Sequence, residues 1–242
     1  MINIKTAALF DGWNETMILS CLQGHMGHLA VDNPGNPCSA RITVGDFCFL
    51  AGIPCEKLIS EADAPIITPQ SEAWCEVIEK VYNNKVRKSS RYSIKKEPAI
   101  FDHNKLNGFV LNLPDGFTLQ RIDESVYDVI IRENWCADFC SLFSGMQDYF
   151  NRGIGFVVIE NGIPVSGASS YTIYDGGIEI EIDTKPEYRK MGLATACGAR
   201  LILECLDRGQ YPSWDAHDLR SVALAEKLCY HMDKEYVVYI KN

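Results

Sequence analysis

The pattern of apolar and polar positions is regular in the second half of the chain. Residues 117–122 read as a strand, and residues 123–152 carry apolar positions at helical spacing, which predicts one or two helices. Further along, the pattern predicts strands at 154–160, 163–174 and 178–184, a helix at 192–206, a strand at 211–216, a helix at 218–228 and a strand at 235–240. Asn161-Gly162 is a strong hairpin signal between the first two of these strands. The expected order is β, αα, βββ, α, β, α, β.

The first half of the chain has a weaker pattern. It predicts a helix over 15–28, with Met17, Leu19, Leu22 and Met26 near one face, then a strand over 41–51 and a helix over 71–82 with Ser71 as N-cap. A turn-forming cluster, residues 112–116, separates the two halves. We therefore expect an N-terminal α/β region, 1–112, whose role the sequence does not give, and a second domain, 113–242.

Composition excludes several classes of protein. With 47% hydrophobic and 23% charged residues, the chain is typical of a soluble globular protein. Its 23 Lys and Arg against 32 Asp and Glu give a net charge of −9, which argues against nucleic acid or an anionic membrane as the main partner. No stretch approaches the roughly 20 apolar residues of a membrane span, and the apolar run at 7–10 is too short for a secretory signal. A soluble, cytoplasmic protein is expected.

The ten cysteines fit this expectation. They are spread over the whole chain, without a secretory signal before them. We expect them to be reduced thiols that serve as small apolar side chains, not disulfides.

The segment from Thr184 to Ala194 is the most informative for chemistry. A predicted strand runs into a turn, and a helix begins directly after Gly192. Free N–H groups at a helix N-terminus and the partial positive charge of the helix favour a phosphate, and glycine lets a ligand approach the backbone closely. Arg189 and Lys190 add local cationic donors. A strand-to-helix connection without a ligand also favours glycine, so the turn alone leaves both interpretations open.

Two motifs together resemble the GNAT (GCN5-related N-acetyltransferase) superfamily. The first is Arg189-x-x-Gly192-x-Ala194, preceded by Pro186-x-Tyr188, which is similar to the pyrophosphate loop of that superfamily. The second is Asp218-x-x-Ser221-x-x-Leu224-x-Glu226-Lys227-Leu228-Cys229-Tyr230, which is similar to its Asn-x-x-Ser-x-x-Leu-Tyr-x-Lys-Leu-Gly-Phe/Tyr block. The resemblance covers about residues 117–241. It implies a GNAT fold, a mixed and largely antiparallel sheet flanked by helices, with an N-terminal α/β extension. Trp214-Asp-Ala-His217 and the long extension also resemble the subgroup that includes zwittermicin-resistance acetyltransferases.

The resemblance implies acetyl-CoA as the acetyl donor and assigns residues to it. Backbone groups of Ile182 and Thr184 would pair with the pantetheine arm, and the turn and helix start would hold the pyrophosphate. The implied cofactor-binding residues are Ile182, Thr184, Arg189, Lys190, Met191, Gly192, Leu193, Ala194, Thr195, Asp218 and Ser221. Three residues depart from the family pattern: Asp218 replaces an Asn, Cys229 a turn Gly, and Ala225 a Tyr that protonates the departing thiolate in many members.

Transfer of an acetyl group to an amine benefits from a base, because an amine with a pKa near 10 is mostly protonated at neutral pH. We favour Glu179 and Glu181, on the strand that lines the acceptor site in this family. The alternative is that both carboxylates face solvent on an alternating strand. Asp215 and His217 are second choices, for which a capping or loop role is the alternative.

A metal site is not expected. Cys21, His25 and His28 would share one face of the predicted helix, but no obvious fourth ligand follows at suitable spacing, although Asp32 or Cys38 is an option. We therefore interpret the chain as an acetyl-CoA-dependent N-acetyltransferase acting on an amine of a small molecule. The rival interpretation is a non-catalytic acyl-CoA-binding or regulatory protein with the same fold. The sequence defines neither the acceptor nor the oligomeric state.

Overall fold

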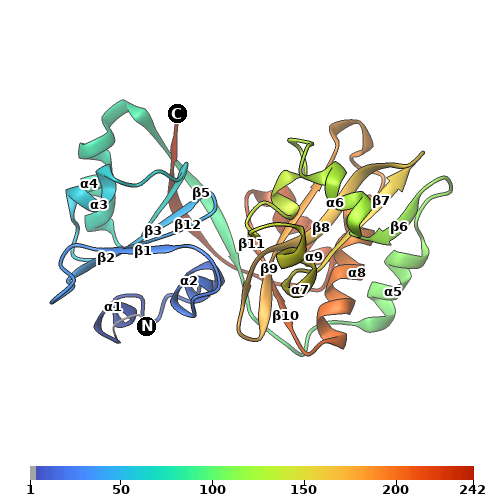
Figure 1. The fold of residues 1–242 in the computed structure, drawn as a ribbon, viewed down its shortest axis with the longest axis horizontal. Coiled ribbons are helices and arrows are strands. Elements are labelled where there is room, and N and C mark those ends of the chain that lie inside the picture. Colours follow the sequence, from blue (N-terminus) through green and yellow to red (C-terminus); the bar gives the residue numbers. More distant parts are fainter. Residues whose placement is uncertain (1–3) are drawn as a thin grey trace. The chain divides into compact units, whose positions relative to one another are not determined.

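The computed structural model describes residues 4–242, which form two compact units (Figure 1). The first contains the chain up to Arg91 together with Glu235–Asn242, and the second is Tyr92–Lys234. Strands β5 (Val86–Ile94) and β12 (Met232–Lys241) each have residues in both units, so the chain passes between the units along these strands. The division predicted at residues 112–113 falls inside the second unit, between helix α5 (His103–Leu111) and strand β6 (Thr118–Arg121).

The first unit is a sheet with helices. Its elements are α1 (Ile4–Ala8), α2 (Thr16–Leu22), β1 (His28–Val31), β2 (Ser39–Val44), β3 (Phe47–Gly52), α3 (Glu56–Ser60), β4 (Ile66–Pro69), α4 (Glu72–Tyr82), the 3-10 helix η1 (Asn83–Lys85) and parts of β5 and β12. The strands follow the order β1-β2-β3-β4-β12-β5. Trp74 of α4 is fully buried in the core and donates its indole N–H to Gly52 O at 2.9 Å.

Two predictions for this unit need correction. The helix expected over 15–28 ends at Leu22, because Gly24 adopts a left-handed conformation (φ +81°) and the N–H of His25 turns back to Ser20 O at 2.9 Å. The strand expected over 41–51 is the hairpin of β2 and β3, which turns at Gly45 (φ +51°). In both places a glycine with positive φ interrupts an apolar pattern that otherwise continues.

The second unit follows the predicted order of elements with two differences: the strand predicted over 211–216 is two short strands in different sheets, and the closing strand predicted over 235–240 is the part of β12 that lies in the first unit. Its elements are α5 (His103–Leu111), β6 (Thr118–Arg121), α6 (Glu124–Ile130), η2 (Ala137–Phe139), α7 (Met146–Arg152), β7 (Gly155–Glu160), β8 (Ile163–Tyr174), β9 (Gly177–Thr184), η3 (Pro186–Tyr188), α8 (Leu193–Asp207), β10 (Tyr211–Ser213), β11 (Asp215–Ala216) and α9 (Leu219–Lys227). The Asn161-Gly162 hairpin is confirmed, with φ of +50° and +79° at its two turn residues.

The sheet of the second unit follows the order β10-β9-β8-β7-β6 and is antiparallel except for the β10–β9 pair. Helix α8 packs along one face of this sheet, and α5 packs against α8 (Figure 1). The predicted fold class, a mixed and largely antiparallel sheet flanked by helices, is confirmed.

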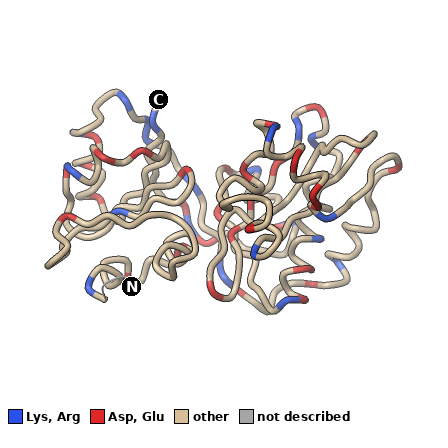
Figure 2. Tube along the Cα trace, viewed as in Figure 1, with Lys and Arg blue, Asp and Glu red and all other residues tan. Residues whose placement is uncertain are grey.

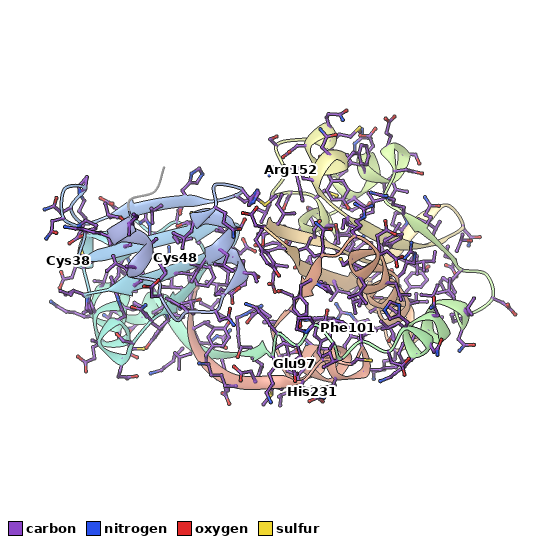
Figure 3. The ribbon with its side chains drawn as sticks, turned by 90° about the horizontal axis from the view of Figure 1, so that it is seen from below. Cys38, Cys48, Glu97, Phe101, Arg152 and His231 are labelled. Atoms are coloured by element: carbon purple, nitrogen blue, oxygen red, sulfur yellow. The ribbon has the colours of Figure 1, made fainter. Side chains whose placement is uncertain are left out.

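The segment before α5 belongs to this unit through aromatic and polar contacts. Phe101 packs edge-on against Tyr230 with ring centroids 5.0 Å apart, and Glu97 lies 2.8 Å from His231 Nδ1 (Figure 3). Tyr230 in turn packs against the buried Trp214. Through these contacts the segment before α5 packs against the end of α9 and against Trp214, which lies between β10 and β11.

Candidate functional site

Strands β9 and β10 separate partway along the sheet. Their parallel pairing runs from Tyr211–Gly177 to Ser213–Glu179 and then stops. The next strand, β11, pairs with Ser93 and Tyr92 of β5 instead. Beyond Glu179, residues 180–184 of β9 therefore have β8 as their strand neighbour on one edge only, among residues 4–242. Extended backbone with such an edge can pair with an extended ligand.

The loop after β9 leads into the N-terminus of α8. Gly192 is the N-cap residue of α8, with φ +83° and ψ 0°, and as a glycine it provides no side-chain cap. A Cβ built on Gly192 would meet nothing within 4 Å. There is thus open space beside Gly192, and the N–H groups of the first helical turn together with the helix dipole suit an anionic group.

Arg189 and Lys190 have different roles in this loop. The Arg189 guanidinium donates from Nε to Thr184 O at 3.1 Å and lies 3.6 Å from Asp183, so it ties the loop to the end of β9. Lys190 has a left-handed backbone conformation, with φ +65°. Lys and Arg are interspersed with Asp and Glu in both units (Figure 2), so any anion must be held by such local groups.

Lys227 adds a cation to this end of α8. Its Nζ donates to Thr195 Oγ1, in the first turn of α8, at 3.4 Å and lies 5.2 Å from the Phe109 ring centre. In the sequence, Lys227 stands out only as part of the second motif. The motif marks Lys227 as a residue of interest. It does not show that Lys227 reaches Thr195, because the two residues are 32 positions apart in the sequence and meet only in the folded structure.

Asp218 and Ser221 are engaged within the protein. Asp218 caps α9 by accepting the backbone N–H groups of Arg220 and Ser221, each at 2.9 Å, and it also binds the Arg220 guanidinium. Partial burial opposes ionisation of Asp218, but these hydrogen bonds outweigh it and lower the pKa of the carboxyl. Ser221 Oγ accepts the indole N–H of Trp214 at 3.1 Å. Both residues shape the start of α9, and their role toward a cofactor stays a prediction.

Ala225 and Cys229, two of the residues that differ from the family pattern, lie near the end of α9. Ala225 is fully buried, with 0% of its surface exposed. Cys229 has φ +82°, and the N–H of Tyr230 reaches Ala225 O at 3.0 Å, which closes the helix as a Schellman motif. The left-handed position in this motif favours glycine, and here a cysteine occupies it.

Glu179 and Glu181 lie on the same face of β9, opposite the face that packs against α8. Glu179 is only 4% exposed, so the alternative in which both carboxylates face solvent does not hold for it. Glu181 is half-buried. The register places Thr172 of β8 beside Glu179, and the pairing of β8 with β9 shifts at Tyr171, as in a β-bulge.

Hydroxyl groups gather next to Glu179. Ser213, its partner on β10, is 1% exposed, and Tyr174 Oη lies 3.1 Å from Ser213 Oγ. The Tyr174 phenol lies over Gly177, where a Cβ would be 2.4 Å from its oxygen. Burial raises the pKa of Tyr174 to about 12, with a further contribution from the negative charge of Glu179. The phenol therefore keeps its proton at neutral pH. Sequence reasoning missed these hydroxyls, because only the register identifies them.

The second-choice residues lie elsewhere in the sheet structure. Asp215 is on β11, paired with Ser93 of β5, and is half-buried. His217 is exposed and directly precedes the N-cap of α9. The structure does not bring either residue onto the β9–β10 ladder.

The residues considered for a metal do not share a helical face. Cys21 lies in α2, where burial raises the pKa of its thiol to about 11, whereas His25 follows the helix end and His28 begins β1. Within residues 4–242, His, Cys, Asp and Glu form no group of three or more that could hold a metal ion. The same stretch contains no helix long and apolar enough to cross a bilayer.

Comparison with known proteins agrees with this geometry. A family model described as GNAT acetyltransferase matches residues 7–239. The chain is 28% identical over 193 residues to the "Uncharacterized N-acetyltransferase YdfB" of Bacillus subtilis (strain 168), which covers 79% of this chain and 71% of that protein.

Solved structures give the same result for the fold. A GCN5-related N-acetyltransferase-like protein from Streptococcus suis 89/1591 superposes with a TM-score of 0.94 at 45% identity, covering 98% of this chain and 96% of that one. A GCN5-related N-acetyltransferase from Kribbella flavida has a TM-score of 0.60 at 15% identity, covering 100% and 96%, and shows similarity of fold alone.

Proposed function

We propose, because this chain belongs to the GNAT acetyltransferase family, that it transfers an acetyl group from acetyl-CoA to an amine of a small molecule. The observation that carries the proposal is the separation of β9 from β10 beside the N-terminus of α8. This arrangement offers an unpaired strand edge and a set of free N–H groups next to each other in sequence and structure.

The residues present fit acetyl-CoA. Backbone groups of Ile182 would pair with the pantetheine arm, and those of Thr184 would do so by exchanging their present partners, Asp183 and Arg189. The N–H groups from Met191 to Thr195 would hold the diphosphate at the helix start, where the missing side chain of Gly192 leaves space. When bound, acetyl-CoA supplies a thioester whose carbonyl carbon the amine attacks.

Glu179 is the base in this proposal. An acceptor amine is mostly protonated at neutral pH, and the lone pair that attacks is available only after the proton leaves. The buried Glu179 carboxylate, on the face of β9 away from α8, would take that proton directly or through a water molecule. The hydroxyls of Ser213 and Tyr174 lie next to it and would hold its orientation.

A second candidate function follows from Ala225. This residue stands where many relatives have a thiolate-protonating Tyr, and it is fully buried. A protein that binds acyl-CoA without turnover would retain the helix start but not need that acid. Because a CoA thiolate is a fair leaving group, we favour catalysis.

The decisive experiment measures thiol release from acetyl-CoA with a panel of amines, beside calorimetric binding of acetyl-CoA to the same preparation. Amine-dependent thiol release with formation of the acetylated amine supports the enzyme. Binding without release across the panel supports the second candidate. The absence of binding contradicts both.

The proposal also covers location and partners. Ten free cysteines fit a reducing compartment such as the cytoplasm. The net charge of −9 does not favour nucleic acid or an anionic membrane as a partner.

A further inference from the structure

The chain contains two Asn-Gly pairs, Asn107-Gly108 and Asn161-Gly162, and both asparagines are exposed. In such a pair the backbone nitrogen of the glycine can attack the side-chain carbonyl carbon of the asparagine, because glycine has no Cβ that would obstruct the approach. Exposure is the same for the two pairs, but their backbone conformations differ. The fold therefore decides which of them reacts, whatever the function of the protein.

The helix α5 holds Asn107 and Gly108 in place. Both residues lie inside the helix, where each backbone N–H donates to the carbonyl four residues earlier. The side chain of Asn107 is also engaged, since its Nδ2 donates to His103 O at 2.9 Å. Attack on the Asn107 side chain would require the loss of these hydrogen bonds and a rotation of helical backbone.

Asn161 and Gly162 form the turn of the β7–β8 hairpin, with φ of +50° and +79°. The flanking residues, Glu160 and Ile163, pair with each other across the turn. In a two-residue hairpin turn the hydrogen bonds of the ladder join the flanking residues, so the ladder does not use the Gly162 N–H. The nitrogen that would attack is thus not held by strand pairing.

The tip of this hairpin extends beyond the rest of its sheet. The β7–β8 pairing is irregular between Val158 and Ile159, and two pairs follow this irregularity before the turn. On the other side of β8, the pairing with β9 begins at Ser166. A short ladder next to an irregularity rotates locally at a lower cost than a strand with a neighbour on each side.

We propose that Asn161 is a site of spontaneous covalent modification, at which the asparagine converts to aspartate and isoaspartate through a cyclic imide. The Gly162 nitrogen loses its proton and bonds to Asn161 Cγ, while the Cγ–Nδ2 bond breaks and ammonia leaves. Water then opens the imide ring, at the side-chain carbonyl to give aspartate or at the main-chain carbonyl to give isoaspartate. The balance is one water molecule taken up and one ammonia molecule released.

The products differ from asparagine in charge and in chain path. Each carries one more carboxylate, and isoaspartate places an additional carbon atom in the backbone between Glu160 and Gly162. Glu160 accepts the hydroxyl of Tyr188 at 2.6 Å, and Tyr188 ends η3, which leads to the loop before α8. The modification therefore lies next to a contact that joins the hairpin to this loop.

The experiment follows both asparagines in the full chain. Folded protein is kept at mildly alkaline pH and digested at intervals, and mass spectrometry of the two Asn-Gly peptides measures the replacement of the amide nitrogen by oxygen. We expect Asn161 to convert at least about tenfold faster than Asn107. In urea at a denaturing concentration the two pairs should convert at similar rates, because neither is then held in a helix or a turn.

Variants identify the source of the modified protein. Each conversion adds one negative charge, so ion-exchange chromatography separates the modified chain. Asn161→Gln should suppress this acidic species, because a glutamine side chain must close a larger ring, whereas the matched control Asn107→Gln should leave it unchanged.

Three results would overturn the inference. The first is a ratio of the two rates below about tenfold in the folded chain. The second is an absence of conversion at Asn161 in the folded chain over a period in which the denatured chain converts. The third is an acidic species that persists in Asn161→Gln.

Discussion

Ser213 on β10 pairs with Glu179 on β9, and this pair is the last before the two strands part. The proposed base, Glu179, thus lies where the pairing of β9 with β10 ends. A side chain at such a point is buried by the paired part of the sheet and is adjacent to the edge where an extended ligand can lie. In the proposed function, this placement lets one strand serve both substrates.

Replacement of Glu179 by Gln should lower kcat/KM by about 10²–10⁴, because the amide keeps the size of the side chain but cannot take a proton. Acetyl-CoA affinity, measured by calorimetry, should stay nearly unchanged. Glu235→Gln, which changes an exposed strand carboxylate of β12, provides the matched control. Full activity in Glu179→Gln would contradict this role, and Asp215 and His217 would become the leading candidates for the base.

Gly192→Val should abolish acetyl-CoA binding. The branched side chain would enter the space beside the first turn of α8, and the left-handed backbone of Gly192 disfavours any side chain. Gly162→Val is the control, since Gly162 has φ +79° and equally open surroundings but lies in the β7–β8 hairpin. Both variants should lose a similar amount of stability in urea, and only Gly192→Val should lose binding. Normal binding by a folded Gly192→Val protein would refute the assignment of the loop.

Alkylation should distinguish the ten cysteines by burial. All ten are free, and burial raises the pKa of thiols such as Cys197 and Cys205 to about 12. Because the thiolate is the reactive form, we expect the exposed Cys38 to be modified first in native protein at about pH 8. Mass spectrometry after denaturation without reductant should show all ten alkylated. The fast native phase should vanish in Cys38→Ser, and a pair of thiols resistant to alkylation in denatured protein would indicate a disulfide.

Cys229→Gly should stabilise the protein. The residue occupies the left-handed position that ends α9, which glycine adopts without the steric cost that a Cβ brings. We expect a gain of about 1 kcal/mol in the free energy of unfolding, measured by urea titration. Cys229→Ala keeps the Cβ and should give no such gain. An equal gain in both variants would show that loss of the thiol, and not the backbone conformation, is responsible.

Asp148 should contribute to the loss of stability in acid. Hydrogen bonds from Arg152 lower the pKa of Asp148 from its ordinary value of 3.8 to about 2. Since the folded protein holds the ionised form more strongly, this contribution is present above about pH 4 and is lost as the pH falls toward 2. Asp148→Asn should therefore cost about 1–2 kcal/mol at neutral pH and little near pH 2. A cost that does not change with pH would contradict the role of this ion pair.

Local signals explain how much of the second unit could be predicted. The Asn161-Gly162 turn and the strict alternation of residues 178–184 are determined by near neighbours, so β7, β8 and β9 appear close to their predicted positions. Residues 123–152 were less predictable. Their apolar side chains suit a helix throughout, but the structure divides them into α6, η2 and α7, and Phe139 of η2 packs against Gly167, a residue far away in sequence.

The candidate site shows the same distinction. Gly192 was identified because a strand, a tight turn and a helix follow one another directly in the sequence. The difference between the buried Glu179 and the half-buried Glu181 arises from where β10 leaves β9, and the positions of Thr172 and Tyr174 depend on a register shift in β8. Such pairings join segments distant in sequence, and alternation alone does not encode them.

The passage of β5 and β12 between the units has a consequence for the order of folding. Residues 92–234 form a continuous stretch with its own sheet, so they can fold as soon as they have been synthesised. The sheet of the first unit requires β12 between β4 and β5, and most of β12 lies in residues 235–242, after the whole of the second unit. The first unit therefore completes its sheet only after β12 has been synthesised and the second unit's sequence has already emerged, although most of its own sequence emerges first.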